Sequence, residues 1–293
     1  MLTLVSPDAD RLAAAEAAIG QALARAGAPV KAHEPLGPVA VDIYLDAEIG
    51  AARKLAAEAL AHLATDVAVQ PLTCRRKRLL IADMDSTIIN VECLDELADF
   101  AGLKAEISAI TERAMRGELE FESALRERVR MLKGLSLGAL QQAYDARVRL
   151  NPGARTLVRT MAQNGARCLL VSGGFTFFTS RVAEAAGFHE QRANTLDEAD
   201  GKLLGTVGEP ILGREAKLAA LTGEAERLGV PLGETLAVGD GANDLAMIEA
   251  AGLGVAYRAK PIVAAQADAK VDHADLTALL YFQGYRADEF VAD

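Results

Sequence analysis

The sequence has no tryptophan, only three cysteines in 293 residues, and few aromatic residues, 4% of the chain. The cysteines Cys74, Cys93 and Cys168 are odd in number, widely spaced and without a Cys-x-x-Cys pair. This pattern excludes a disulfide scaffold and disfavours a zinc site. It indicates structural thiols in a reducing compartment.

Positive charge and long apolar runs are also scarce. The chain has 31 lysines and arginines against 41 acids, a net charge of −10, which argues against binding nucleic acid or an anionic membrane. The first apolar run, Leu2–Val5, is too short for a secretory signal, and no segment approaches the roughly 18 apolar residues of a membrane span. We therefore expect a globular cytoplasmic protein.

Residues 1–73 predict strand, helix, strand, strand, helix and strand, the order of a ferredoxin-like α+β domain. The strands are expected at 2–5, 29–34, 39–45 and 66–71, and the helices at 8–26 and 48–64. The segment resembles the small amino-acid-binding ACT modules. However, the loop at residues 6–10 lacks the glycine that such modules usually place at a ligand site. We favour a structural or dimerising domain, so a homodimer is an open alternative.

The basic cluster Cys74-Arg-Arg-Lys-Arg78 is interpreted as a solvated approach to the next strand and as a domain boundary. From residue 78 to 293 strands alternate with helices, which predicts a three-layer, Rossmann-like parallel sheet. Apolar runs at 79–82, 168–171 and 235–238 are typical of strands buried on both faces.

Two segments interrupt this alternation. Residues 90–150 show amphipathic helical stretches without a strand signal and predict a helical insertion after the first strand. Residues 192–207 predict a hairpin with Asp200-Gly201 as its turn. Helix ends are expected at four glycines, Gly165, Gly187, Gly229 and Gly252.

Polar residues follow each of the three buried strands. The segments are Asp83-Met-Asp85-Ser-Thr87, Ser172-Gly-Gly174 and Gly239-Asp240-Gly-Ala-Asn243-Asp244. Because ligands bind beyond the carboxyl ends of parallel strands, these segments should meet in one crevice. Acids gathered there repel one another unless a cation compensates, and oxygen-only ligands favour Mg²⁺.

With a helical Lys217, these segments resemble the four motifs of the haloacid dehalogenase superfamily, in its chain order, over about residues 78–290. The residues support phosphoryl transfer to a carboxylate, with Asp83 as nucleophile and Asp85 as general acid and base. Mg²⁺ would be held by Asp83, Asp240 and, as the resemblance implies, the backbone carbonyl of Asp85.

The phosphate would be bound by the remaining motif residues. Ser172 and the Gly173 amide, expected at a helix N-terminus, would contact its oxygens. Lys217, in the first turns of a helix at 213–228, would supply positive charge. Asn243 would orient the phosphate and Asp244 a metal-bound water.

In this superfamily a helical insertion after the nucleophile strand is a cap that selects the substrate. Residues 90–150 resemble the cap of the branch that acts on phosphoserine. Phe121, Leu125 and Arg128 are spaced to share one helix face, and an arginine on an apolar face suits a desolvated carboxylate. The resemblance implies that Arg128 binds the substrate carboxylate, Glu92 its amine, and Met115 with Phe121 the seryl carbon.

The expected reaction is Mg²⁺-dependent hydrolysis of O-phosphoserine to serine and phosphate, the last step of serine biosynthesis in that branch. The same motifs would also serve another small phosphomonoester, or phosphoryl transfer to an alcohol such as homoserine. A non-catalytic sensor of a phosphorylated metabolite is a further alternative. The second aspartate, Asp85, argues against it, because a binder does not need an acid–base residue. Alone, Glu92 and Arg128 could equally be surface residues.

Overall fold

The computed structural model describes residues 1–115 and 118–292. Its first unit has the predicted order of elements, and its strands pair antiparallel in the order β2-β3-β1-β4. The elements are β1 (Leu2–Val5), α1 (Ala9–Arg25), β2 (Val30–Gly37), β3 (Ala40–Leu45), α2 (Ile49–Leu60) and β4 (Asp66–Val69). Side chains of Asp8 and Glu48 cap the two helices. One sheet face packs apolar residues such as Leu4 and Ile43 against both helices.

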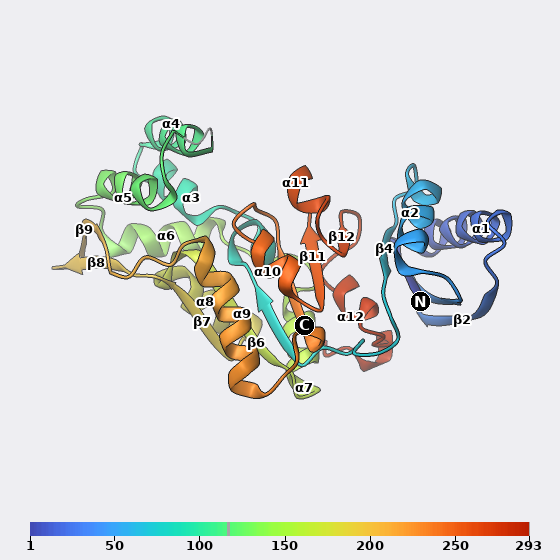
Figure 1. Ribbon diagram of the computed structural model, residues 1–293. Helices are drawn as coiled ribbons and strands as arrows, with labels where there is room; N and C mark the ends of the chain where they lie inside the picture. The colour runs from blue at the N-terminus through green and yellow to red at the C-terminus, as the bar shows by residue number, and fades with distance from the viewer. Residues whose placement is uncertain (116–117, 293) are drawn as a thin grey trace.

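The second unit is an α/β core with a parallel sheet, as the sequence predicts (Figure 1). Its first elements are β5 (Leu79–Ala82), an irregular turn (Met84–Ile88), α7 (Ala154–Gln163), β6 (Arg167–Phe175), α8 (Thr176–Ala186), β7 (Glu190–Asn194), β8 (Leu196–Ala199), β9 (Lys202–Val207) and α9 (Arg214–Leu228). The others are a turn at Leu232–Glu234, β10 (Thr235–Gly239), α10 (Leu245–Ala250), β11 (Leu253–Tyr257), α11 (Pro261–Ala264), β12 (Ala269–Val271), α12 (Ala278–Phe282) and a turn at Ala287–Glu289.

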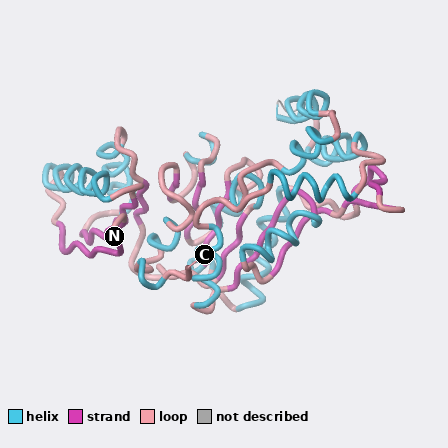
Figure 2. Tube along the Cα trace, turned by 180° about the vertical axis from the view of Figure 1, so that it is seen from behind, coloured by secondary structure: helices cyan, strands magenta, loops and turns pink. Residues whose placement is uncertain are grey.

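Helices cover both faces of this parallel sheet (Figure 2). Along β5, Leu79 and Ile81 pack in the cluster with α9, α10 and α11. Leu80 and Ala82 point to the other side, where they join α7, α8 and α12. Successive strand residues face opposite ways, so a strand buried on both sides reads as an unbroken apolar run. The three-layer prediction is confirmed.

The expected helix ends are confirmed at three of the four glycines. Gly165, Gly187 and Gly229 follow their helices with φ of 83°, 94° and 62°. The expectation for Gly252 is wrong, because α10 ends at Ala250 and the next residue, Ala251, is already extended. A Cβ on Gly252 would lie 2.2 Å from the carbonyl oxygen of Gly233. This glycine therefore permits close approach of two backbones.

The two units share one ten-stranded sheet, in the order β2-β3-β1-β4-β12-β11-β10-β5-β6-β7. The junction is the antiparallel pairing of β4 with β12. From the sequence we predict two separate sheets, one in each unit. No local signal in β12, which has three residues, predicts that the two sheets join.

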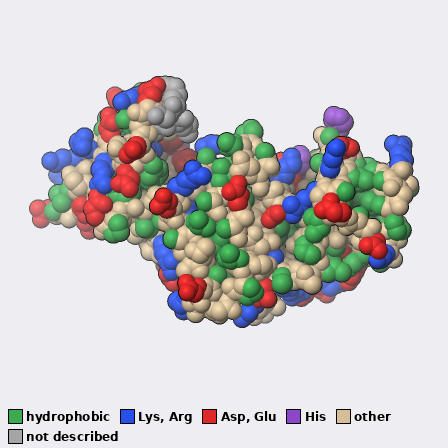
Figure 3. Space-filling view, in the orientation of Figure 1, with side chains coloured by type: hydrophobic (Ala, Val, Ile, Leu, Met, Phe, Trp, Pro, Cys, Tyr) green, Lys and Arg blue, Asp and Glu red, His purple; other side chains and the backbone are tan. Residues whose placement is uncertain are grey.

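The interpretation of the basic cluster as a solvated approach to a strand holds for the exposed Arg76 and Arg78, but it is wrong for Arg75 and Lys77. Arg75 pairs with the buried Asp42, and Lys77, only 5% exposed, donates to the Gly233 carbonyl at 2.8 Å. The two other arginines form ion pairs, Arg76 with Glu289 and Arg78 with Glu234. Acidic and basic side chains are mixed over the face seen in Figure 3. The cluster therefore joins the segment between the two units to both of them by ion pairs and hydrogen bonds.

The helical insertion is confirmed as a cap above the sheet (Figure 1). It comprises α3 (Cys93–Phe100), α4 (Lys104–Met115), α5 (Phe121–Met131) and α6 (Leu137–Arg147). The chain enters and leaves it side by side, through an antiparallel bridge between Ile89 and Leu150. Within the described residues, no helix is both long and apolar enough to span a membrane.

Candidate active site

The aspartate pair lies where β5 ends and the chain turns. The Asp83 N–H donates to the Val238 carbonyl on the adjacent β10 at 3.0 Å, which fixes the start of the turn. Ser86 adopts a left-handed conformation with φ of 55°, and its backbone N–H donates to the Val91 carbonyl at 3.2 Å, which closes the turn. The Asp85 carboxylate accepts the Cys93 N–H at 3.0 Å and the Ser172 hydroxyl at 3.4 Å. The cap's first helix thus orients Asp85.

A buried lysine connects two of the predicted strand ends. Lys217, in the first turn of α9, donates to Asp83 Oδ1 at 2.5 Å and to Asp244 Oδ1 at 2.6 Å. The three side chains are nearly inaccessible to solvent. Asp244 also accepts the Gly241 N–H at 3.0 Å. This arrangement orients the Asp83 carboxylate and leaves its other oxygen without a lysine partner.

Asp83, Asp240 and Asp244 form a cluster that fits a divalent cation. One carboxylate oxygen from each lies within 4.8 Å of the others. A Cβ at Gly239 would lie 2.4 Å from Asp244 Cγ, so glycine allows the loop to fold back on the strand. An all-oxygen set of ligands suits a hard ion such as Mg²⁺.

Burial and mutual repulsion raise the pKa values of these acids. Burial raises the pKa of Asp83 well above its usual value, and the charge of Asp244 adds to the effect. Burial and then Glu92 raise the pKa of Asp85 to about 7, while burial and Asp244 raise that of Asp240 to about 6. A bound cation would favour the ionised forms. A pKa near 7 suits Asp85 for giving and taking a proton at neutral pH.

Lys217 stays charged although it is fully buried. Burial alone would lower its pKa, but the carboxylates of Asp83 and Asp244 outweigh burial and raise the pKa above its usual value. The positive charge of Lys217 therefore balances only part of the negative charge of Asp83, Asp240 and Asp244.

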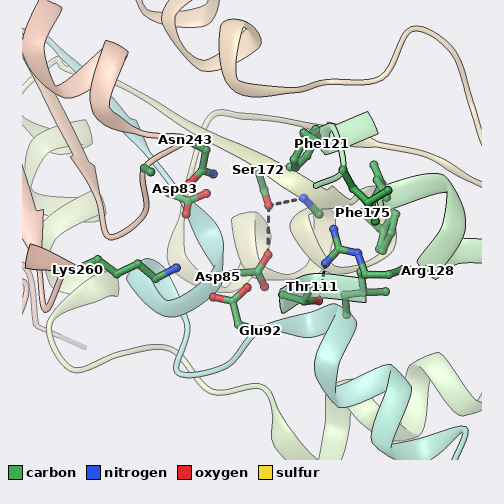
Figure 4. Close-up of a pocket in the computed structure, with 16 residues that line it drawn as sticks. Asp83, Asp85, Glu92, Thr111, Phe121, Arg128, Ser172, Phe175, Asn243 and Lys260 are labelled. Carbon is green, nitrogen blue, oxygen red and sulfur yellow. Dashed lines mark hydrogen bonds between the residues drawn. The ribbon is translucent and has the colours of Figure 1, made fainter. Parts of the chain in front are cut away.

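A cavity of about 360 Å³ lies between the strand ends and the cap (Figure 4). Most of the predicted site residues line it, namely Asp83, Asp85, Glu92, Phe121, Arg128, Ser172, Gly173 and Asn243. Lys217, Asp240 and Asp244 are not among the lining residues but join the site through Asp83. Met115 ends α4, and its side chain lies outside the described part of the structure.

The predicted phosphate loop lies within β6, before the helix instead of at its start. The helix α8 begins at Thr176, so the expected helix N-terminus at Ser172 and Gly173 is wrong by several residues. The Gly174 N–H donates to Ser172 Oγ at 2.9 Å. A Cβ on Gly173 would lie 3.3 Å from the Phe121 ring. A glycine here lets the cap approach the loop.

The cap presents an arginine and a glutamate to the cavity. Arg128 donates to the Ala124 carbonyl at 3.2 Å and to Thr111 Oγ1 at 3.4 Å. Both of these hydrogen-bond partners are neutral oxygens, and neither is a carboxylate. Burial lowers the pKa of Arg128, so an anion beside it would be favourable. Glu92 accepts the Ser86 hydroxyl at 2.6 Å and lies beside Asp85 (Figure 4).

Five residues that line the cavity are not predicted from the sequence, and two of them, Lys260 and Thr111, are polar; the others are Leu94, Leu119 and Phe175. Lys260 extends its side-chain amine toward the acids in Figure 4, and its backbone N–H donates to the Asp240 carbonyl at 3.1 Å. It lies just beyond the carboxyl end of β11, a strand that the sequence analysis does not single out. Thr111 supports Arg128 from α4, and no sequence signal distinguishes it from other helical threonines.

The sequence profile of haloacid dehalogenase-like hydrolases matches residues 80–249. The chain belongs to this family. A phosphoserine phosphatase of Polaromonas is 46% identical over 223 residues, 74% of this chain and 94% of that protein. One of Streptomyces coelicolor is 45% identical over 81% of this chain, which spans only 58% of that longer protein.

A solved structure matches both units of the molecule together. A HAD family hydrolase of Salmonella enterica serovar Typhi has a TM-score of 0.85 at 27% identity, covering 96% of this chain and 97% of that one. The N-terminal unit and its attachment to the core are therefore part of an architecture found in another family member.

Proposed function

We propose that this protein is a Mg²⁺-dependent phosphoserine phosphatase, which hydrolyses O-phosphoserine to serine and phosphate. The observation that carries the proposal is the placement of groups around the cavity. Asp83 and Asp85 lie at its inner end, while Arg128 and Glu92 face it from the cap side. A phosphorylated amino acid offers a matching phosphate, carboxylate and ammonium. The similarity to curated phosphoserine phosphatases at 45–46% identity supports this substrate.

The first step transfers the phosphoryl group to the protein. An oxygen of Asp83 forms a bond to phosphorus, and the bond from phosphorus to the seryl oxygen breaks. Asp85 gives its proton to that oxygen, so serine leaves as the neutral alcohol. The hydrogen bond from Lys217 holds the Asp83 carboxylate in place and offsets the charge gathered at the phosphate.

The second step releases phosphate and regenerates both acids. Asp85, now ionised, takes a proton from a water molecule whose oxygen attacks phosphorus. The bond between phosphorus and Asp83 breaks, and the aspartate carboxylate is restored. Ser172 and the Gly173 amide line the cavity beside this centre and would bind phosphate oxygens, while Asn243 completes the wall.

Mg²⁺ would be held by Asp83, Asp240 and the Asp85 carbonyl, and it would reduce repulsion between the phosphate and the nucleophile. The acid cluster and its raised pKa values support this assignment. Asp244 would keep Lys217 in position from the opposite side.

The test is phosphate release from a panel of phosphorylated amino acids and sugars, with Mg²⁺ and after chelation. We expect phosphoserine to give the highest kcat/KM and chelation to abolish activity. A sugar phosphate preferred over phosphoserine would overturn the proposal. Adding homoserine separates hydrolysis from transfer, because a phosphotransferase would then release less phosphate than serine.

A further inference from the structure

The hairpin of β8 and β9 projects from the core and lies against the cap (Figure 1). Its turn is Asp200–Gly201 with φ of 49° and 72°, as the sequence predicts. The proposed reaction does not use this hairpin. Its backbone nevertheless contacts the segment that follows α5, the helix that carries Phe121 and Arg128.

Three backbone hydrogen bonds join the hairpin to residues 134–137 of the cap. They are Gly134 N–H to Leu203 O at 2.8 Å, Leu203 N–H to Leu135 O at 2.9 Å, and Leu137 N–H to Gly201 O at 3.0 Å. An antiparallel bridge pairs Ser136 with Lys202. An ion pair between Arg126 and Glu209 ties α5 itself to the segment after β9. The cap therefore adds an extended segment to the edge of the hairpin.

Gly205 brings β9 into close contact with α5. Alternation along the strand buries Leu203, Gly205 and Val207 and exposes the residues between them. A Cβ on Gly205 would lie 2.9 Å from Lys133 Cβ and 3.2 Å from the Arg130 carbonyl oxygen. A methyl group at this position would push the end of α5 away from the strand.

The base of the hairpin is fixed to the predicted phosphate loop. Asn194, 2% exposed, donates to the Gly173 carbonyl at 2.9 Å and accepts the Leu212 N–H at 2.7 Å. The Gly208 N–H donates to the Thr195 carbonyl at 2.8 Å and closes the base. Hydrogen bonds thus run from the phosphate loop, through the hairpin, to the cap helix that carries Arg128.

We propose that the β8–β9 hairpin sets the separation between the phosphate loop and Arg128, and thereby the length of phosphorylated amino acid that the cavity accepts. Gly205 is a positioning residue, which touches no substrate and fixes α5. The inference rests on the proposed function, because phosphate and carboxylate are the two groups whose separation is recognised. Displacing one binding group by about 1 Å can cost about a hundredfold in rate.

The test compares Gly205→Ala with Gly201→Ala in the full chain. Both glycines have positive φ, 79° and 72°, so both alanines carry similar backbone strain, but only Gly205 lacks space for a Cβ. The substrates are phosphoserine and an aryl phosphate, which has no carboxylate. We expect Gly205→Ala to lower kcat/KM for phosphoserine by about tenfold to a hundredfold, mainly through KM, with a far smaller loss on the aryl phosphate.

A second pair of variants guards against a simple loss of folding. Leu203→Ala removes a buried side chain beneath the cap, and Leu4→Ala removes one from the N-terminal core. Only Leu203→Ala should raise KM for phosphoserine. Equal losses on both substrates in Gly205→Ala, or equal effects within each pair, would overturn the inference. A wild-type protein that hydrolyses the aryl phosphate but not phosphoserine would instead overturn the proposed function.

Discussion

The N-terminal unit and the cap are both additions to the catalytic sheet, but they are attached in opposite ways. The N-terminal unit continues the sheet itself, because β4 pairs with β12. The cap lies outside the sheet and is connected by two adjacent strand-like segments and the β8–β9 hairpin. None of the described cavity residues comes from residues 1–78, whereas the cap supplies Glu92, Phe121 and Arg128.

The contacts at the N-terminal junction are buried and polar. Arg75 bridges the two units, since it pairs with the inaccessible Asp42 and donates to the Phe282 carbonyl at 3.0 Å. The Asp66 carboxylate accepts the N–H groups of the loop after β12, at Asp272, His273 and Ala274. Breaking such contacts leaves desolvated polar groups without partners. We therefore expect the N-terminal junction to contribute to stability, whereas the proposed function gives substrate selection to the cap.

The largest effect on stability should follow from Asp42→Asn. The change leaves the Arg75 guanidinium buried beside a neutral amide and should lower the free energy of unfolding by about 3–5 kcal/mol. Urea unfolding measures this loss. Asp46→Asn is the control, because its pair with Lys31 is exposed and should contribute at most about 1 kcal/mol. A changed KM for phosphoserine in folded Asp42→Asn would contradict the division of roles.

Arg128→Ala should lower activity on phosphoserine while leaving the stability of the protein nearly unchanged. Loss of the charged hydrogen bonds to the substrate carboxylate should lower kcat/KM for phosphoserine by about a hundredfold or more. The aryl phosphate should be nearly unaffected, and the thermal midpoint should change little. Arg130→Ala, an exposed arginine of the same helix, is the matched control. Similar losses on both substrates would show that the cap does not select an amino acid.

Mg²⁺ should stabilise the folded protein through the acids at the strand ends of the core, and not through the N-terminal junction. At a hundred times its Kd, Mg²⁺ should add about 2.7 kcal/mol to the free energy of unfolding, because it binds the folded state. Asp240→Asn should abolish most of this gain, whereas Asp42→Asn should keep it. An equal gain in wild type and Asp240→Asn, measured by thermal unfolding with and without chelator, would refute the predicted cation site.

The smallest effect should follow from Lys260→Ala. This exposed amine faces the cavity, and among the described residues it has no ion-pair partner. Its loss should reduce attraction of the anionic substrate, lowering kcat/KM about threefold at low salt and weakening its dependence on ionic strength. Lys270→Ala, an exposed lysine of β12 that does not line the cavity, is the control. A salt dependence unchanged from wild type would exclude this role for Lys260.

Most residues of the candidate active site could be predicted from the sequence, whereas the junction between β4 and β12 could not. The three polar segments could be placed together because parallel strands end at the same edge of a sheet, and this holds for Asp83, Ser172 and Asp240. Helical spacing likewise places Phe121, Leu125 and Arg128 on the cavity face of one helix.

Features that depend on non-local pairing escaped the sequence analysis. The fusion of the two sheets depends on β12, three residues long, and on Asp66, which gives no local sign of its distant amide partners. Burial of Lys77 and the close approach at Gly252 likewise depend on the Gly233 backbone, far along the chain. Lys260 was missed for a different reason, since β11 ends without an acidic motif.

The most direct test of the account is to trap the phosphorylated protein during turnover of phosphoserine. Rapid acid quenching, proteolysis and mass spectrometry would locate the added group. The account predicts one phosphoryl group on Asp83, which disappears in Asp83→Asn together with phosphate release. Full activity in Asp83→Asn, or a phosphoryl group on another residue, would contradict it.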